Sequence, residues 1–194
     1  MLKPVTLSVD WQGPYQWLQA IDPSTSGALN AGWPGVYVFV SVNTTRVIAR
    51  YLGKSLHSVV YRQWEHFEKI VDGEYHLYGQ NGTRTFTKGT IKPVNFIDLI
   101  EEYVLMTEVY FGQLSLSHTA ASGHIVDSII DSTEGVLLSC PAWASHTGVI
   151  INYRSGSNYY KAFDKFEISH KGCHFMTKMF GSQTVWDRSL QKIT

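Results

Sequence analysis

The chain has 194 residues, of which 44% are hydrophobic and 13% aromatic, and its formal net charge is zero. This length and composition are typical of one globular domain with a complete core, and they exclude an intrinsically disordered chain. No apolar run approaches the length of a membrane span, so we expect no membrane partner. Lys3 is followed at once by proline, which does not fit a signal peptide, so we expect a cytoplasmic protein whose cysteines are reduced.

Charge is distributed unevenly along this neutral chain. Residues 46–92 hold eight Lys or Arg and four acids, residues 93–153 hold seven acids and no Lys or Arg, and residues 154–194 hold seven bases and three acids. Such a partition allows a basic face on a neutral protein, as nucleic acid binding requires. The alternative is ordinary solvated charge, and the sequence leaves both open.

The first half of the chain predicts three strands and a helix. Residues 5–11 alternate and predict a short strand, whereas residues 13–33 are rich in turn-forming residues that break any long element. Residues 35–42 and 46–55 are rich in β-branched and aromatic side chains and flank a turn-like NTT stretch, which predicts an antiparallel hairpin. Apolar residues then recur at helical spacing, with Ser58 as the N-cap.

The second half is less regular. Residues 73–99 are strand-like and interrupted by turns, with a hairpin turn at the Asn-Gly pair 81–82. We expect a strand over residues 104–114, although the sequence around it is ambiguous between helix and strand. Helical spacing returns over residues 121–139, with a break near Gly135, and loops and short strands follow.

The hairpin and the helix after it gather chemically active side chains. Because side chains alternate across a strand, Tyr37 and Tyr51 on neighbouring strands can share one face of the sheet. Arg62 and His66 are four residues apart and therefore lie on one face of the helix. We predict that these four residues form a shallow cleft suited to phosphodiester hydrolysis, since arginine binds phosphate and a phenol or imidazole can position or deprotonate water. The alternative is an aromatic core beside a solvated Arg/His pair.

The order of these motifs resembles that of the GIY-YIG nuclease superfamily. The sequence GVY ends at Tyr37, YLG begins at Tyr51, a lysine and a serine follow, and Arg62 begins an RxxxH motif. Residues 34–67 carry most of the resemblance. It extends to a later helix, where Glu134 stands three residues before a pair of leucines, as the family's catalytic glutamate precedes leucine and isoleucine. The GEYHLYG stretch also resembles insertions in restriction-enzyme members.

The resemblance implies a role for each residue. Tyr37 would act as the general base on water, or assist it, and Tyr51 would bind the phosphate and position that water. Arg62 would stabilise the phosphorane-like transition state, and His66 would support it or relay protons. Glu134 would hold a single Mg²⁺ or Mn²⁺ that neutralises the leaving oxygen.

Further residues are candidates for contact with substrate or metal. Lys54, directly after the glycine of the second hairpin strand, lies close enough to touch a phosphate, and His57 lies beside the same loop. Lys161 and Lys165, in a stretch with paired tyrosines, are candidates for a DNA-contacting loop. The HKGCH stretch at 170–174 offers metal-ligand types, but we interpret it as a hairpin turn.

One position departs from the family pattern. The family places an asparagine near the end of the domain, where this chain has Ala144, and Asn152 is a candidate substitute. The alternatives are a natural variant, an altered chain, or a protein that has lost catalysis.

The sequence as a whole predicts an α/β (α+β) domain with a small, mainly antiparallel sheet flanked by helices. We expect one GIY-YIG-like domain, residues 1–194, divided into an N-terminal extension (1–33), a core hairpin and helix (34–72), an insertion (73–115), a glutamate-bearing helix and loop (116–153) and a C-terminal extension (154–194). The resemblance implies a metal-dependent, restriction-like endonuclease that cuts double-stranded DNA, and cutting both strands suggests a homodimer. The alternative is a catalytically inactive module that binds nucleic acid or protein.

Overall fold

The computed structural model describes residues 4–22, 33–43, 46–116, 123–145, 148–151 and 158–194. The strands are β1 (Val5–Gln16), β2 (Gly35–Val42), β3 (Val47–Ser55), β4 (Leu77–Tyr78), β5 (Arg84–Phe86), β6 (Thr107–Leu116), β7 (Val149–Ile150), β8 (Lys165–Gly172), β9 (Gln183–Asp187) and β10 (Lys192–Ile193). The helices are α1 (Trp17–Ile21), α2 (Val59–Val71), α3 (Phe96–Leu105), α4 (Gly123–Leu138), α5 (Pro141–Ser145), the 3-10 helix η1 (Asn158–Ala162) and α6 (His174–Phe180).

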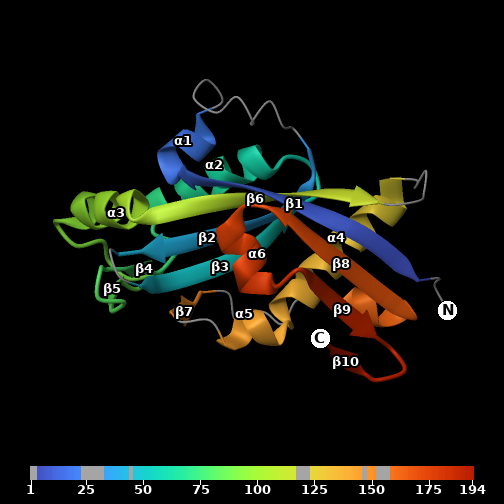
Figure 1. The fold of residues 1–194 in the computed structure, drawn as a ribbon. Helices are drawn as coiled ribbons and strands as arrows, with labels where there is room; N and C mark the ends of the chain where they lie inside the picture. The colour runs from blue at the N-terminus through green and yellow to red at the C-terminus, as the bar shows by residue number, and fades with distance from the viewer. Residues whose placement is uncertain (1–3, 23–32, 44–45, 117–122, 146–147, 152–157) are drawn as a thin grey trace.

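Most of the strands belong to one large sheet in the order β10-β9-β8-β1-β6-β2-β3-β7, and β4 and β5 form a separate hairpin (Figure 1). Within the large sheet, β1–β8 and β3–β7 are parallel and the other neighbouring pairs are antiparallel. The predicted α/β class and mainly antiparallel pairing are therefore confirmed. The expectation of a small sheet was wrong, because β6 from the expected insertion and β8 to β10 from the expected extension join the same sheet.

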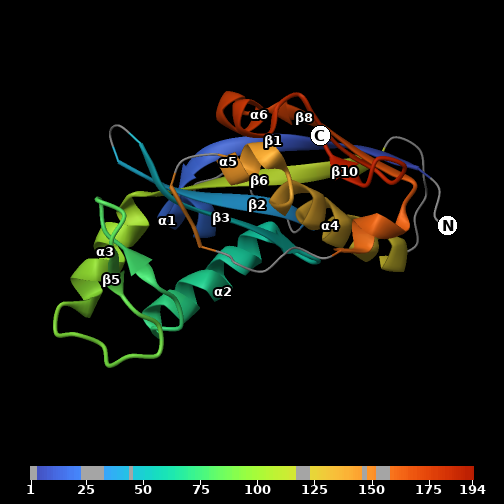
Figure 2. The ribbon, with the colours of Figure 1, turned by 90° about the horizontal axis from the view of Figure 1, so that it is seen from below.

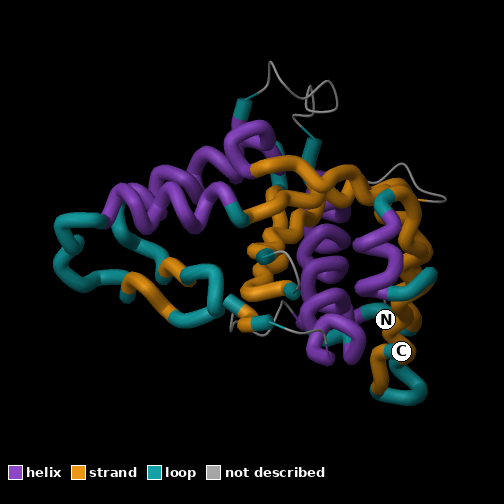
Figure 3. Tube along the Cα trace, turned by 60° about the vertical axis from the view of Figure 1, so that its left-hand side comes forward, coloured by secondary structure: helices purple, strands orange, loops and turns teal. Residues whose placement is uncertain are grey.

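Helices cover both faces of this sheet. Helices α1, α2 and α3 bury Trp17, Val59 and Phe96 in the core on one face. Helices α4, α5 and α6 bury Ile129, Trp143 and Met176 in the core on the other face. Figure 2 shows α2 and α3 on the opposite side of the sheet from α5 and α6, and Figure 3 shows the β4–β5 hairpin beside α2 and α3. A functional site must therefore use one of these faces or an edge where they meet.

The predicted hairpin and helix are confirmed. β2 pairs with β3 so that Tyr37 is opposite Gly53 and Phe39 is opposite Tyr51. Helix α2 begins where expected, because the Ser58 side chain accepts a hydrogen bond from the backbone N–H of Tyr61 at 3.1 Å. This cap fixes the direction in which α2 leaves the end of β3.

Two predicted strand boundaries, the end of β1 and the start of β6, were wrong. β1 continues to Gln16 instead of ending near Trp11, because the Gly13-Pro14 pair is accommodated as an irregularity in the β1–β6 ladder. The predicted strand over 104–114 starts later, at Thr107, since residues 96–105 form α3. The hairpin turn at 81–82 is present between β4 and β5, with Gly82 at a φ of 81°.

The C-terminal half holds more helix than expected. Helix α4 runs unbroken through Gly135, and residues after Pro141 include α5 and α6. The HKGCH stretch is not a hairpin turn: Gly172, with a φ of 80°, ends β8, and α6 begins directly after Cys173. His170 is buried in this region, where Trp11 Nε1 donates to its Nδ1 at 3.2 Å and its Nε2 lies 3.0 Å from Thr184 Oγ1.

Candidate functional site

The two signature tyrosines lie on the α2 face of the sheet, as predicted. Their rings stack with centroids 6.1 Å apart. Gly53 makes this arrangement possible, since a Cβ there would lie 2.5 Å from the Tyr37 hydroxyl and 2.7 Å from Cε1 of Tyr51. The glycine of the YLG motif is thus required by the tyrosine pair, because any larger residue would occupy the same space.

His66 connects the pair to a third tyrosine. The Tyr37 hydroxyl is 2.6 Å from Nε2 of His66, and the Tyr75 hydroxyl is 2.8 Å from Nδ1. His66 is only 1% exposed and has aromatic rings around it, including Phe39 and Tyr51. Burial, helped by the positive charges of α2, lowers the pKa of His66 to about 3. The imidazole is therefore neutral at neutral pH.

Tyr75 is a residue of this cluster that the sequence did not predict. It lies in the GEYHLYG stretch just after α2, which carried the resemblance to restriction enzymes but offered no periodic signal for the direction of any side chain. Burial raises the pKa of Tyr75 to about 12. Tyr75 is only partly buried, so the cluster extends from the core toward the surface.

Arg62 provides the positive charge beside these phenols. Its guanidinium forms an ion pair with Glu65 and lies close enough to Tyr37 to lower the pKa of that hydroxyl. Burial dominates at Tyr37, however, and raises its pKa well above 10. Burial lowers the pKa of Arg62, but Glu65 and Tyr37 outweigh it and the net shift is upward. The cluster thus combines a neutral phenol, a neutral imidazole and a permanent cation.

A second charged group lies on the α4 face. The Lys54 ammonium forms ion pairs with Asp131 and, at 3.1 Å, with Glu134, and these side chains are 27%, 20% and 15% exposed. Burial raises the pKa of Glu134 although Lys54 opposes the shift. Asp131 was not predicted from sequence, although its position one helical turn before Glu134 was a readable signal.

These two groups lie on opposite faces of β3. Tyr51 packs in the core under α2, whereas Leu52, the next residue, packs in the core under α4. The groups approach each other at the end of β3, where Arg62 lowers the pKa of both Tyr37 and Glu134. Among the described residues, β7 pairs with β3 only at Ala49 and Arg50, so no described strand pairs with this last part of β3 on its outer side.

Tyr37, Tyr51, Arg62 and His66, which we expected in a shallow cleft, do lie together. They are more deeply buried than a shallow cleft would allow. Tyr37 and His66 are each 1% exposed, whereas Tyr51 and Arg62 are half-buried. The arrangement is a buried pair with two partly accessible residues at its rim. The reason is that β2 is a central strand, with β3 on one side and β6 on the other, and α2 lies above it.

The carboxylates of α4 fit a divalent cation. Asp131 and Glu134 converge on one positive charge, the Lys54 ammonium, and carboxylate oxygen is the ligand type that Mg²⁺ prefers. No cluster of three or more His, Cys, Asp and Glu side chains that could hold a metal occurs in the described part of the chain. Two carboxylates are nonetheless enough for Mg²⁺, which keeps several waters and also binds substrate phosphate.

The other predicted substrate contacts are dispersed. His57 is exposed just before α2, near the end of β3. Lys161 is exposed on η1, which packs against α4. Lys165 pairs with Glu167 at 2.7 Å on β8, and β1, β6 and β2 separate that strand from β3. His57 and Lys54 therefore lie at the end of β3, whereas Lys165 lies four strands away in the sheet.

The structure describes Ala144, the position at which we expected the family's asparagine. Ala144 is exposed on α5, which follows α4 after a short turn. Asn152 lies outside the described residues. Helix α5 itself is held by buried Arg50, whose guanidinium donates to the carbonyl of Trp143 at 2.8 Å.

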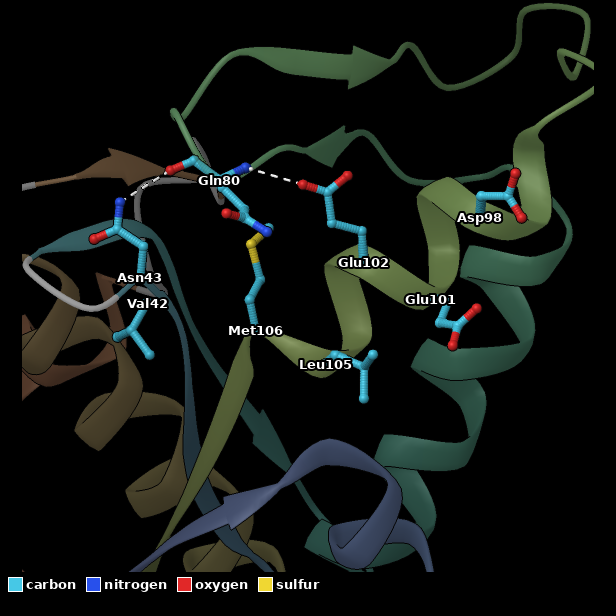
Figure 4. A pocket seen from close by; sticks show the side chains of 8 residues that line it. All are labelled: Val42, Asn43, Gln80, Asp98, Glu101, Glu102, Leu105 and Met106. Atoms are coloured by element: carbon cyan, nitrogen blue, oxygen red, sulfur yellow. Dashed lines mark hydrogen bonds between the residues drawn. The ribbon is translucent and has the colours of Figure 1, made fainter.

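A cavity of about 660 Å³ lies at the other end of β2, away from the predicted residues. It is lined by the following side chains of β2, α3 and their loops: Val42, Asn43, Gln80, Asp98, Glu101, Glu102, Leu105 and Met106 (Figure 4). The Gln80 backbone bridges Asn43 and Glu102 across it. Three carboxylates in the lining would repel a phosphate, so this cavity does not suit nucleic acid.

Comparison with known proteins identifies no relative: no protein-family model, no curated protein and no solved structure matches this chain.

Within the described residues, no helix has both the length and the apolar character needed to cross a membrane. Cys140 and Cys173 are both free thiols, as expected.

Proposed function

We propose that this protein is a metal-dependent endonuclease that hydrolyses phosphodiester bonds in double-stranded DNA. The observation that carries the proposal is the pairing of Tyr37 with His66 beside the Arg62 guanidinium. A phenol and an imidazole in hydrogen-bond contact can move a proton, and a guanidinium can hold the phosphate whose ester bond is broken. The Lys54, Asp131 and Glu134 group, across β3, would complete the site.

The chemistry of this pair follows from its burial. Tyr37 is protonated at neutral pH, because burial raises its pKa, so it does not act as a preformed phenolate. Instead it accepts a proton from the attacking water while its own hydroxyl proton passes to Nε2 of His66. Tyr51, stacked on Tyr37 and partly accessible, would orient the water. Arg62 would stabilise the negative charge that develops on the non-bridging oxygens.

Mg²⁺ or Mn²⁺ would be held by Glu134 and Asp131. When bound, the ion would neutralise the charge that develops on the leaving oxygen. In the structure Lys54 forms ion pairs with both carboxylates, so Lys54 and a divalent cation would compete for them. A phosphate entering the site would offer Lys54 another partner.

The resemblance to GIY-YIG nucleases supports the same assignment. The motifs occur in the expected order, and their tyrosines, arginine and histidine meet in space. We further propose a restriction-like enzyme that acts as a homodimer, since one site addresses one strand. His57, Lys161 and Lys165 would then contribute to the positive surface that contacts the DNA backbone.

A second candidate function is a catalytically inactive module on the same scaffold that binds nucleic acid or protein. Two observations favour it: Ala144 stands where the family has asparagine, and Lys54 already neutralises the carboxylates expected to hold metal. The intact Tyr37–His66 hydrogen bond opposes it, because binding alone does not need this contact.

The test is cleavage of plasmid and phage DNA by the purified protein with Mg²⁺, with Mn²⁺ and with EDTA. Tyr37→Phe and Glu134→Ala are compared with Tyr78→Phe, another buried tyrosine, and with Glu101→Ala at an exposed position of α3. We expect cleavage that EDTA abolishes. We expect both site variants to lose at least about 100-fold in rate, as removal of a proton-transfer group typically does, whereas both control variants keep it.

Intact DNA under every condition would contradict the nuclease proposal. Ala144→Asn would then separate the two alternatives. Activity gained in that variant would mean that this one position silenced the site, and continued inactivity would leave the binding module as the better description.

A further inference from the structure

We infer that Tyr75 is a positioning residue that holds His66 in the tautomer protonated at Nδ1, so that Nε2 faces Tyr37 as a proton acceptor. The role of Tyr75 in cleavage rests on the proposed function. The tautomer of His66 depends only on the hydrogen bonds of three side chains, Tyr37, His66 and Tyr75.

The lengths of the two hydrogen bonds indicate which atoms donate. Hydrogen bonds from N–H to oxygen are usually about 2.7–3.2 Å long, whereas O–H donors form bonds down to about 2.5 Å. The contact between the Tyr37 hydroxyl and Nε2 is 2.6 Å, so Tyr37 is the better donor in that bond. Arg62, which can only donate and cannot accept the Tyr37 proton, lies close enough to that hydroxyl to oppose the rise of its pKa that burial causes.

The state of the second ring nitrogen follows. A neutral imidazole has one donor and one acceptor nitrogen. If Nε2 accepts from Tyr37, then Nδ1 carries the proton and donates to the Tyr75 hydroxyl, 2.8 Å away. The burial of His66 keeps the ring neutral at neutral pH, and the positive charges of Arg62 and Lys69 act in the same direction.

This arrangement gives the proton of the attacking water a continuous path. As the water oxygen bonds to phosphorus, one water proton moves to the Tyr37 oxygen and the Tyr37 proton moves to Nε2. Because a buried imidazolium is unfavourable, Nδ1 releases its proton to the Tyr75 oxygen and the Tyr75 hydroxyl proton leaves to solvent. One proton is thus lost by water and one is gained by solvent, and every group between them stays neutral.

The surroundings of Tyr75 fit this last step. A cavity of about 30 Å³ is lined by Tyr51, His66 and Tyr75, among others. This cavity has the volume of one or two waters, at about 10–15 Å³ each; its lining is mainly apolar, and the polar groups that a water would need include those of Tyr51, His66 and Tyr75. Tyr75 is itself partly exposed. The three residues therefore border a place where a water molecule can accept the proton.

The test combines a spectroscopic readout with kinetics. The protein is labelled with ¹⁵N at histidine, and the tautomer of His66 is read from its ring nitrogen resonances at neutral pH. We expect the Nδ1–H form in the wild type and a shift toward Nε2–H in Tyr75→Phe, which loses the acceptor of that proton. Tyr78→Phe is the matched control, because it removes a buried hydroxyl from β4 without touching His66.

Single-turnover cleavage and DNA affinity are then measured on the same variants. We expect Tyr75→Phe to lower the single-turnover rate by about 100-fold, because it removes the group that passes the proton to solvent, with the Kd for DNA unchanged. An Nε2–H ring in the wild type, or a wild-type rate in Tyr75→Phe, would overturn the inference. If the wild type cuts no DNA, the proposed function fails, and the tautomer measurement still decides the assignment of the hydrogen bonds.

Discussion

Two buried histidines, His66 and His170, look alike in most respects and differ in what surrounds them. Each is hydrogen-bonded through both ring nitrogens and stacked or packed against aromatic rings. Burial lowers the pKa of both, to about 3 for His66 and about 4 for His170. Burial and pKa shift therefore do not show which of the two histidines takes part in the proposed chemistry.

The partners distinguish them. His170 accepts from the indole of Trp11 and contacts Thr184, in a core where burial is what lowers its pKa. His66 contacts two phenols that can exchange protons with it, and the Arg62 guanidinium is close enough to lower its pKa. The partners of the histidine, two phenols and a nearby guanidinium, and not the histidine itself, therefore mark the candidate site.

The largest expected effect comes from replacing each histidine by leucine. His66→Leu should lower the rate of DNA cleavage by about 100-fold or more, the typical contribution of a proton-transfer group. His170→Leu should leave the rate per folded molecule within a few-fold of wild type. Both variants should lose stability, because each leaves a buried hydrogen-bonding group without a partner, at about 1–3 kcal/mol per group. Urea unfolding gives the folded fraction by which each single-turnover rate is corrected.

Equal losses of corrected activity in the two variants would mean that the two histidines do not differ in function. His66 would then be a structural residue like His170, and the Tyr37–His66 contact would carry no argument for catalysis.

The next largest effect should come from replacing two glycines, Gly53 beside the Tyr37–Tyr51 pair and Gly172 at the end of the strand that carries His170. Gly53→Ala places a methyl group 2.5 Å from the Tyr37 hydroxyl, and Gly172→Ala places one 2.3 Å from the carbonyl oxygen of Trp11 at a φ of 80°. Overpacking of this kind costs about 1–3 kcal/mol, so both variants should lower the midpoint of urea unfolding. Only Gly53→Ala should also reduce cleavage by the folded protein, because only it displaces the tyrosine pair. Normal cleavage by folded Gly53→Ala would mean that the position of Tyr37 is not important.

Part of this site could be predicted from sequence for a simple reason. Strand alternation and helical spacing are strict, so Tyr37 and Tyr51 were assigned to one face, and Arg62 was placed near them, from residue numbers alone. The same periodicity predicted Ser58 as the N-cap. These features depend on contacts between elements that are adjacent in the chain.

The features that could not be predicted depend on the long-range fold. Tyr75 follows α2 in a stretch without periodicity, so nothing in the sequence indicated that its hydroxyl would meet His66. Asp131 was missed although it stands one turn from Glu134, because only the position of Lys54 shows that both acids point to one cation. Helix α3 has buried Phe96, Ile100 and Tyr103 at helical spacing, but the β-branched and aromatic residues that follow it favoured a strand.

A smaller effect should appear when the pH is lowered. The folded-state pKa values of both histidines are below the ordinary value of 6.5, so between about pH 6.5 and pH 4 the unfolded chain binds more protons than the folded one. Stability should therefore be complete above pH 6.5 and fall as the pH decreases, by up to about 1.4 kcal/mol per pH unit for each histidine.

Urea unfolding at several pH values between 7 and 4 measures this slope. Either leucine variant should reduce the slope by a similar amount, since each removes one of the two groups. A slope that only one variant reduces would mean that the other histidine keeps an ordinary pKa.

The smallest effect concerns two lysines, Lys54 on β3 and Lys165 on β8. Lys54 forms ion pairs with Asp131 and Glu134, for which it would compete with the proposed metal, whereas Lys165 lies on the strand of His170 and pairs with Glu167. Because a partly buried ion pair of this kind contributes on the order of 1 kcal/mol, Lys54→Met should tighten Mn²⁺ binding by about 3- to 10-fold, and Lys165→Met should not change it. Titration calorimetry without DNA measures both affinities. Glu134→Ala in the Lys54→Met background should abolish the gain. An unchanged affinity in Lys54→Met would show that these carboxylates hold the lysine only, and the proposed metal would then have to bind elsewhere.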